Sequence, residues 1–149
     1  MAVKPIPEGY NTVIPHLSLR DCTKAVEFYK KVFGAEERNR APGPGGKVMH
    51  TELKVGDSFF YASDEFGPPS TPTGVTIHIW STDPDNVFDR AVKNGATVKM
   101  PLANQFWGDR YGQFTDPWGH TWAVSKHVED VSPADMAERA QAAFAQMKK

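Results

Sequence analysis

The chain has 149 residues, of which 40% are hydrophobic, and this length lets one domain bury a core without disulfides. Its 17 basic and 18 acidic residues nearly cancel, which argues against a nucleic-acid binder. The N-terminus lacks the apolar run of a signal peptide, no apolar stretch reaches membrane-spanning length, and Cys22 has no partner for a disulfide. These features predict a cytoplasmic protein that binds small molecules or proteins, with no nucleic-acid or membrane partner.

The first half of the chain has the pattern of a βαβββ unit. Residues 12–19 alternate as in a strand, and Asp21 is placed to cap a helix that ends at Gly34. Three strands are then predicted at 36–40, 48–55 and 58–63, the last two joined as a hairpin. The Pro/Gly-rich residues 42–46 predict a turn before this hairpin.

The second half repeats this pattern. His16-Leu17-Ser18-Leu19-Arg20-Asp21 matches His78-Ile79-Trp80-Ser81-Thr82-Asp83, and Gly34-Ala35 recurs as Gly95-Ala96. The same order of elements is predicted there: a strand at 75–81, a helix at 84–93, and strands near Thr97, at 106–114 and at 120–125. The repeat therefore predicts one domain, residues 1–131, built from units at about 10–63 and 74–127 with a proline-containing linker at 64–73.

A last helix is predicted in residues 132–149, because Ser132 can cap it and Pro133 suits its first position. Its apolar side chains form one stripe: Met136, Ala140, Ala143, Phe144 and Met147. We expect this stripe to pack on the domain or on a second subunit.

Several of these features together resemble the vicinal oxygen chelate superfamily, which includes glyoxalase I, bleomycin-resistance proteins and extradiol dioxygenases. They are the tandem βαβββ units, the helix end Phe33-Gly34-Ala35-Glu36 and the closing Asp116-Pro117-Trp118-Gly119-His120. Residues 48–53 and 105–110 are similar to stretches of its demethylubiquinone-methyltransferase-like branch. The resemblance implies an α+β fold in which the tandem units form a cleft of concave mixed sheets, with a C-terminal helix, and implies a homodimer.

Strand alternation assigns side chains to the helix side or the cleft side of each sheet. His16 and His78 are predicted on the cleft side, at equivalent places in the repeat. In the last strand of each unit, the same reasoning sends two sets of side chains toward the cleft: Ser58, Phe60 and Ala62, and Thr121, Ala123 and Ser125.

The resemblance also locates the positions where metal-dependent members carry their ligands. They correspond here to Ile14, Phe60, Thr76 and Ala123, none of which is a good metal ligand. This departure argues against the metal-dependent activities of the superfamily. We therefore predict no metal site and no cofactor, although His16 and His78 could contribute two ligands to a divalent ion.

The expected ligand-binding residues combine both histidines with the aromatic residues and the guanidinium of the cleft: His16, Phe60, His78, Trp80, Trp107, Arg110 and Tyr111. One hypothesis is a protein that binds a small aromatic or planar organic ligand without a metal. The alternative is a lyase, isomerase or dioxygenase-type enzyme, in which His16 and His78 are acid-base or metal-binding groups. A third interpretation makes both histidines structural, hydrogen-bonded in the cleft wall. The sequence leaves these alternatives open, enzymatic activity included.

Overall fold

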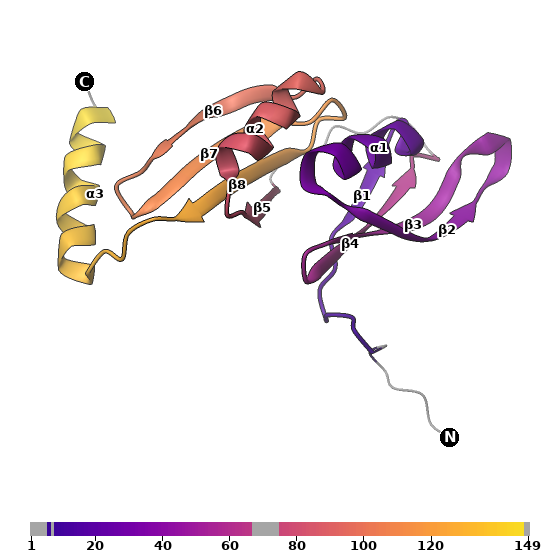
Figure 1. The fold of residues 1–149 in the computed structure, drawn as a ribbon, viewed down its shortest axis with the longest axis horizontal. Coiled ribbons are helices and arrows are strands. Elements are labelled where there is room, and N and C mark those ends of the chain that lie inside the picture. Colours follow the sequence, from indigo (N-terminus) through magenta and orange to yellow (C-terminus); the bar gives the residue numbers. More distant parts are fainter. Residues whose placement is uncertain (1–5, 7, 67–74, 148–149) are drawn as a thin grey trace. The chain divides into compact units, whose positions relative to one another are not determined.

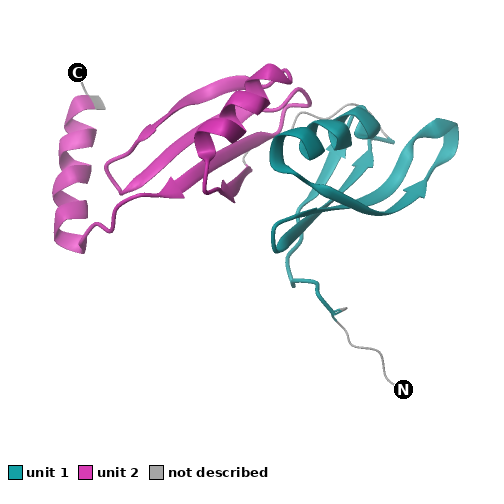
Figure 2. Ribbon diagram, in the orientation of Figure 1, with its two compact units in different colours: residues 1–71 teal, residues 72–149 magenta. Residues whose placement is uncertain are grey.

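The structure, a computed structural model, describes residues 6, 8–66 and 75–147. The chain forms two compact units, residues 1–71 and 72–149 (Figure 2). Each unit has one four-stranded mixed sheet and one helix packed against it (Figure 1). The predicted α+β class and the tandem βαβββ order are confirmed. No helix in the described ranges is long and apolar enough to cross a membrane.

In the first unit, the sheet has the strand order β1-β4-β3-β2, and β1 runs parallel to β4. The elements are β1 (His16–Leu19), α1 (Cys22–Phe33), β2 (Glu36–Pro42), η1 (Pro44–Gly46), β3 (Val48–Val55) and β4 (Ser58–Asp64). Helix α1 begins where the Asp21 side chain accepts a hydrogen bond from the Lys24 amide, and it ends at Gly34 with φ 68°. Both predicted caps of this helix are confirmed.

The second unit has the same topology, in the order β5-β8-β7-β6, with β5 parallel to β8. Its elements are β5 (Thr76–Trp80), α2 (Pro84–Lys93), β6 (Thr97–Asn104), β7 (Asp109–Thr115) and β8 (Thr121–His127), followed by α3 (Pro133–Met147). The expected strand at 106–114 begins later than predicted, because Gln105 to Gly108 form the turn that leads into β7. Helix α3 begins as predicted, since Ser132 Oγ accepts a hydrogen bond from the Asp135 amide.

Buried side chains lie between each helix and its sheet. Tyr29 of α1 and Leu53 of β3 are fully buried in the first unit, as are Phe114 and Trp122 in the second. The ring of Phe88 on α2 lies 5.5 Å from that of Phe114. Burial of these side chains is the main driving force that holds each helix on its sheet.

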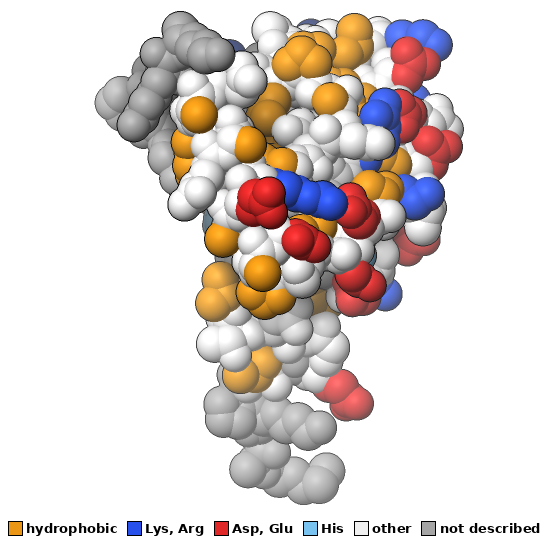
Figure 3. Space-filling model, turned by 90° about the vertical axis from the view of Figure 1, so that its left-hand side faces the viewer, with side chains coloured by type: hydrophobic (Ala, Val, Ile, Leu, Met, Phe, Trp, Pro, Cys, Tyr) orange, Lys and Arg blue, Asp and Glu red, His pale blue; other side chains and the backbone are white. Residues whose placement is uncertain are grey.

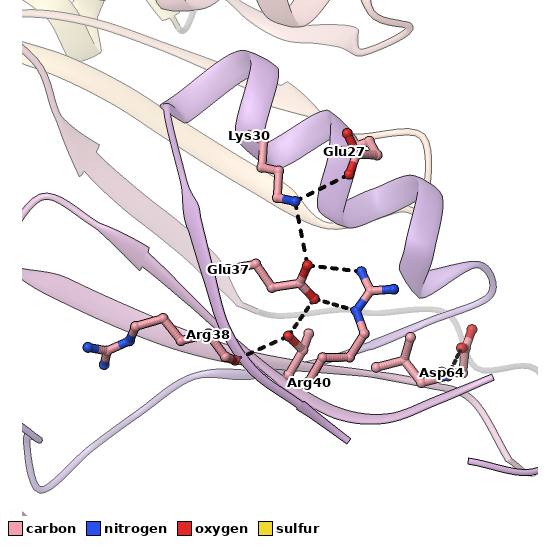
Figure 4. Close-up of polar contacts among 8 residues, drawn as sticks. Glu27, Lys30, Glu37, Arg38, Arg40 and Asp64 are labelled. Carbon is pink, nitrogen blue, oxygen red and sulfur yellow. Dashed lines mark hydrogen bonds and ion pairs between the residues drawn. The ribbon is translucent and has the colours of Figure 1, made fainter. Parts of the chain in front are cut away.

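A network of charged side chains ties β2 to α1 in the first unit (Figure 4). The Glu37 carboxylate accepts hydrogen bonds from Arg40 at 2.5 and 3.1 Å and from the Thr51 hydroxyl at 2.7 Å. Lys30 of α1 adds an ion pair at 3.5 Å. Burial alone would raise the pKa of Glu37, but the hydrogen bonds from Arg40 and Thr51 hold it below its ordinary value. These charges are satisfied by one another, which gives the network a structural role.

The segment Asp116-Pro117-Trp118-Gly119-His120 closes the hairpin between β7 and β8. The Asp116 carboxylate accepts hydrogen bonds from the amides of Trp118 and His120, each at 3.0 Å, and from the Trp122 indole at 2.8 Å. Asp116 is 3% exposed, and Trp122 is fully buried. The aspartate thus fixes the turn and satisfies a buried indole N–H.

We expect Asp116→Ala to lower the free energy of unfolding by about 2–4 kcal/mol, because three donors lose a charged acceptor and one of them is buried. Asp57→Ala is the matched control, since Asp57 lies in the exposed β3–β4 turn and accepts a hydrogen bond from its neighbour Ser58. That control should change the free energy by no more than about 0.5 kcal/mol. Urea denaturation followed by tryptophan fluorescence measures both, and equal losses in the two variants would contradict the assigned role.

Candidate functional site

The sheet face opposite the helix, called here the open face, carries a repeated His–Ser pair in each unit. His16 Nε2 lies 3.0 Å from Ser63 Oγ, and His78 Nε2 lies 2.5 Å from Ser125 Oγ. Both pairs join residues 47 positions apart, so the repeat reproduces the interaction as well as the fold. The predicted placement of both histidines on the open face is confirmed. Sequence reasoning did not pair either of them with a serine.

Both histidines favour the neutral form. Each retains contact with solvent, but partial desolvation of the ring lowers the pKa below its ordinary value, and His50 adds to this effect at His16. The serine hydroxyls are less accessible, since Ser63 is 8% exposed and Ser125 is fully buried. The pairs therefore orient neutral imidazoles on the open face and do not present an accessible serine nucleophile.

The open face of the second unit carries a continuous row of aromatic rings. The ring of His78 stacks on Trp80 at 4.7 Å and lies 5.8 Å from Tyr111, which in turn lies 5.4 Å from Trp107. Trp80 is 61% exposed. Gln113 donates a hydrogen bond to the Tyr111 hydroxyl at 2.7 Å. The structure thus brings together four of the residues predicted to bind a ligand, and adds Gln113.

The open face of the first unit has a smaller aromatic cluster beside His16. The rings of His50 and Tyr61 lie 4.7 Å apart, and the His16 ring lies 6.0 and 6.1 Å from them. Neither His50 nor Tyr61 was predicted to belong to the site. Strand alternation could have indicated His50. It lies two residues before Glu52 in β3, and Glu52 is the strand partner of Tyr61, so His50 lies on the same face.

The expectation that Phe60 lies on the open face is wrong. Phe60 is 5% exposed, and its ring contacts Tyr29 of α1 at 5.4 Å, so it belongs to the core. Tyr61 takes its place, since Tyr61 is the direct strand partner of His16. A shift of one residue along a strand moves a side chain to the other face of the sheet.

The placement expected for Arg110 is also wrong. Arg110 is the second residue of β7, and it faces α2, where Nε and Nη2 donate to the two carboxylate oxygens of Asp85 at 2.8 and 2.6 Å. Its neighbour Tyr111 points to the open face, as alternation along a strand requires. Arg110 therefore anchors β7 to the first turn of α2.

The side chains present do not fit the metal site of the superfamily. With Tyr61 in place of Phe60, the corresponding positions hold an aliphatic side chain, a phenol, a hydroxyl and a methyl group: Ile14, Tyr61, Thr76 and Ala123. Within residues 8–66 and 75–147, no three His, Cys, Asp or Glu side chains gather as a metal site would require. The histidine pairs instead use Nε2 for their serine partners.

Residues 13–124 match the model of the Glyoxalase/Bleomycin resistance protein/Dioxygenase superfamily. The chain belongs to this superfamily. An uncharacterized protein of Mycobacterium bovis is 41% identical over 128 residues, which cover 79% of this chain and 84% of that protein.

Two solved structures of this superfamily fold are similar to the chain. The Pseudomonas aeruginosa protein PA1353 has a TM-score of 0.71 and 26% identity, covering 80% of this chain and 99% of its own. A PhnB protein of Bacillus cereus, named for 3-demethylubiquinone-9 3-methyltransferase, has a TM-score of 0.64 and 18% identity, covering 78% and 99%. The second likeness shows the fold alone.

The pKa of His127 is shifted in the opposite direction from those of His16 and His78. Its two ring nitrogens lie 2.7 Å from Asp130 and 2.8 Å from Asp109. The hydrogen bonds to Asp130 and Asp109 raise the pKa of His127 above its ordinary value.

We expect the pKa values of His16 and His78 to lie below 6.5 and that of His127 above it. Imidazole proton shifts recorded by NMR between pH 4 and 9 would measure all three. Asp130→Asn is the control, and it should return the pKa of His127 toward its ordinary value while leaving the other two unchanged. A pKa of His16 or His78 above that of His127 would contradict the electrostatic account.

The same shifts predict opposite effects on stability. A histidine with a lowered folded pKa stabilises fully above its unfolded pKa of 6.5, and that contribution is lost as the pH falls through the folded value. The contribution of His127 is present below 6.5 and is lost as the pH rises through its raised folded pKa.

Proposed function

We propose that this protein binds a small aromatic or planar organic ligand on the open faces of its sheets without a metal, as a cytoplasmic homodimer. The aromatic row of the second unit carries the proposal. An indole that is 61% exposed and stacked on an imidazole offers a flat apolar surface to solvent. Such a surface suits a planar ligand, which would gain both stacking and the release of water.

The polar groups around the row add directionality to this surface. His78 is held by Ser125, and Gln113 holds the Tyr111 hydroxyl, so two hydrogen-bonding side chains keep fixed orientations beside the rings. Preorganised polar groups next to an apolar wall are the usual composition of a small-molecule site. Because both histidines favour the neutral form, the face is suited to an uncharged planar group.

The metal-free part of the proposal rests on donor chemistry. The positions that correspond to the metal ligands of related proteins hold Ile14, Tyr61, Thr76 and Ala123, and this set lacks the imidazole and carboxylate donors that divalent ions prefer. A chelator should therefore leave ligand binding unchanged.

We expect His16→Ala or His78→Ala to weaken binding of a ligand found in a thermal-shift screen of aromatic compounds by about 1–2 kcal/mol, the cost of a lost hydrogen bond. Trp80→Ala and Trp107→Ala should cost at least as much, because stacking area is lost. Trp118→Ala is the control, since Trp118 lies in the turn that follows Asp116. Titration calorimetry with and without EDTA measures all five variants.

The enzyme alternative gives a different pattern in the same experiment. An acid-base role would let one His→Ala variant keep its affinity for the ligand and lose turnover. A metal role would make binding sensitive to EDTA, which would refute the metal-free proposal. Equal affinities of wild type, Trp80→Ala and Trp107→Ala would refute binding on the aromatic row.

The homodimer part of the proposal rests on α3. Phe144 is 56% exposed and lies 6.5 Å from Phe106, while Met136 is partly buried. The side chain of Met147 lies outside the described residues. Figure 3 looks onto the face that carries α3 and shows hydrophobic side chains exposed among acidic and basic ones. An exposed apolar side chain such as Phe144, on a helix whose first turn is capped by Ser132, is a suitable dimer contact.

We expect light scattering to give the mass of a dimer at tens of micromolar protein. Phe144→Ser should shift the distribution toward the monomer, because it removes an exposed apolar side chain from the proposed contact. Phe66→Ser is the matched control, since Phe66 is 48% exposed on the first unit. A monomeric mass for the wild-type protein would refute the dimer.

A further inference from the structure

The segment before β1 places a phenol ring on the open face of the first unit. The Tyr10 hydroxyl lies 2.8 Å from each carboxylate oxygen of Glu52, a residue 42 positions further along the chain. The Tyr10 ring lies 4.9 Å from the ring of Phe59, at an interplanar angle of 30°. Tyr10 is therefore recognised twice, at its hydroxyl and at its aromatic face.

The Glu52 carboxylate that accepts this hydrogen bond is buried and has two further partners. Glu52 is 6% exposed, and burying a carboxylate is costly unless it is hydrogen-bonded and paired. Asn39 donates a hydrogen bond to it at 3.3 Å, and Arg38 forms an ion pair with it at 3.5 Å. Three side chains thus converge on one buried carboxylate of the open face.

A local distortion of β2 supports this arrangement. Asn39 has a φ of 55°, and the register between β2 and β3 shifts between Arg38 and Ala41. A bulge of this kind redirects side chains, and a left-handed non-glycine residue is energetically unfavourable without compensation. Here the bulge brings the Asn39 amide to Glu52, so the distortion serves the site around the carboxylate.

Tyr10 satisfies this site incompletely. The hydrogen bond to Glu52 raises the pKa of Tyr10, which keeps the phenol protonated as a donor. The Arg38 guanidinium lies 4.7 Å from the Phe59 ring, yet its buried Nε has no hydrogen-bond partner among the described residues. An occupant with a further oxygen acceptor would satisfy a donor that Tyr10 leaves unpaired.

We propose that Tyr10 occupies a binding site for phenols, and that a hydroxylated aromatic ligand enters it by displacing Tyr10 from Glu52 and Phe59. The inference rests on the proposed function and deepens it, because it names the ligand class of the first unit. Tyr61 is the strand partner of both Glu52 and His16. A ligand larger than one ring therefore extends from Glu52 toward Tyr61 and His16.

Tyr10 competes with such a ligand from within the same chain. A tethered group has an effective concentration on the order of millimolar, so a free single-ring phenol binds the wild-type protein weakly. Removal of the Tyr10 side chain should expose the site. A residue that only contacted the ligand would have the opposite effect, because its removal would weaken binding.

The test uses p-cresol, which reproduces the tyrosine side chain, and toluene, which lacks the hydroxyl. We expect p-cresol to bind Tyr10→Ala at least about tenfold more tightly than wild type, as measured by titration calorimetry or ligand-observed NMR. In this variant, toluene should bind at least about tenfold more weakly than p-cresol, because it cannot donate to Glu52. Adding Glu52→Gln should reduce that preference at least about threefold.

Tyr10→Phe provides a second variant if Tyr10→Ala fails to fold, since it keeps the ring on Phe59 and removes only the bond to Glu52. We expect it to bind p-cresol about two- to tenfold more tightly than wild type. Equal affinity of wild type and both Tyr10 variants for p-cresol would overturn the proposal. Equal affinity of Tyr10→Ala for p-cresol and toluene would also overturn it.

Trp80→Ala separates this inference from the proposed function. If the p-cresol results fail while Trp80→Ala still weakens the screened ligand, the phenol site is refuted and the proposed function stands. If p-cresol behaves as expected while Trp80→Ala has no effect on the screened ligand, ligand binding on the aromatic row is refuted and the phenol site stands.

Discussion

The parallel pairing of the first and last strands determines what each open face presents. Parallel neighbours cannot be joined by a tight turn, so a helix and two further strands intervene in each unit. In the first unit the end of β4 is held by Asp64, which accepts hydrogen bonds from the Cys22 amide at the start of α1 and the Val48 amide at the start of β3. With the strand ends fixed in this way, His16 meets Ser63, and the equivalent register in the second unit brings His78 to Ser125.

The same register defines one row of side chains across each open face. Direct strand partners share a face. In the first unit the row is His16, Tyr61, Glu52 and Arg38, and in the second it is His78, Ala123, Gln113 and Met100. The fold has therefore been duplicated with its histidine retained, while the rest of the row has diverged. The first unit has an ion pair where the second has an amide and a thioether.

Sequence patterns predicted the repeat, the sheet face of His16 and His78, and the helix caps, because these features depend on local spacing. The error at Phe60 came from treating the turns before the last strands of the two units, at Gly56 and at Gly119, as equivalent. Gly56 lies in a tight turn, whereas Gly119 lies in a wider turn closed by Asp116, so the two glycines are not equivalent and the strand face was assigned one residue out of step. Arg110 was grouped with the aromatic residues of the cleft by residue type, without applying the strand alternation that sends it to α2. The contact of Tyr10 with Glu52 spans 42 residues and leaves no local signal.

The two open faces therefore make different demands on a ligand. The second unit offers stacked rings beside a neutral imidazole. This arrangement favours the binding of a planar ligand and tolerates different substituents on it. The first unit offers a buried carboxylate whose Oε2 contacts Asn39 and Arg38 and whose Oε1 accepts from Tyr10, so a ligand that displaces Tyr10 must replace its donor. A site with such a requirement discriminates strongly against ligands that lack the hydroxyl, whereas a stacking surface does not. Tyr10 meets this requirement when no ligand is bound, which explains why a residue that precedes β1 lies on the open face of the sheet.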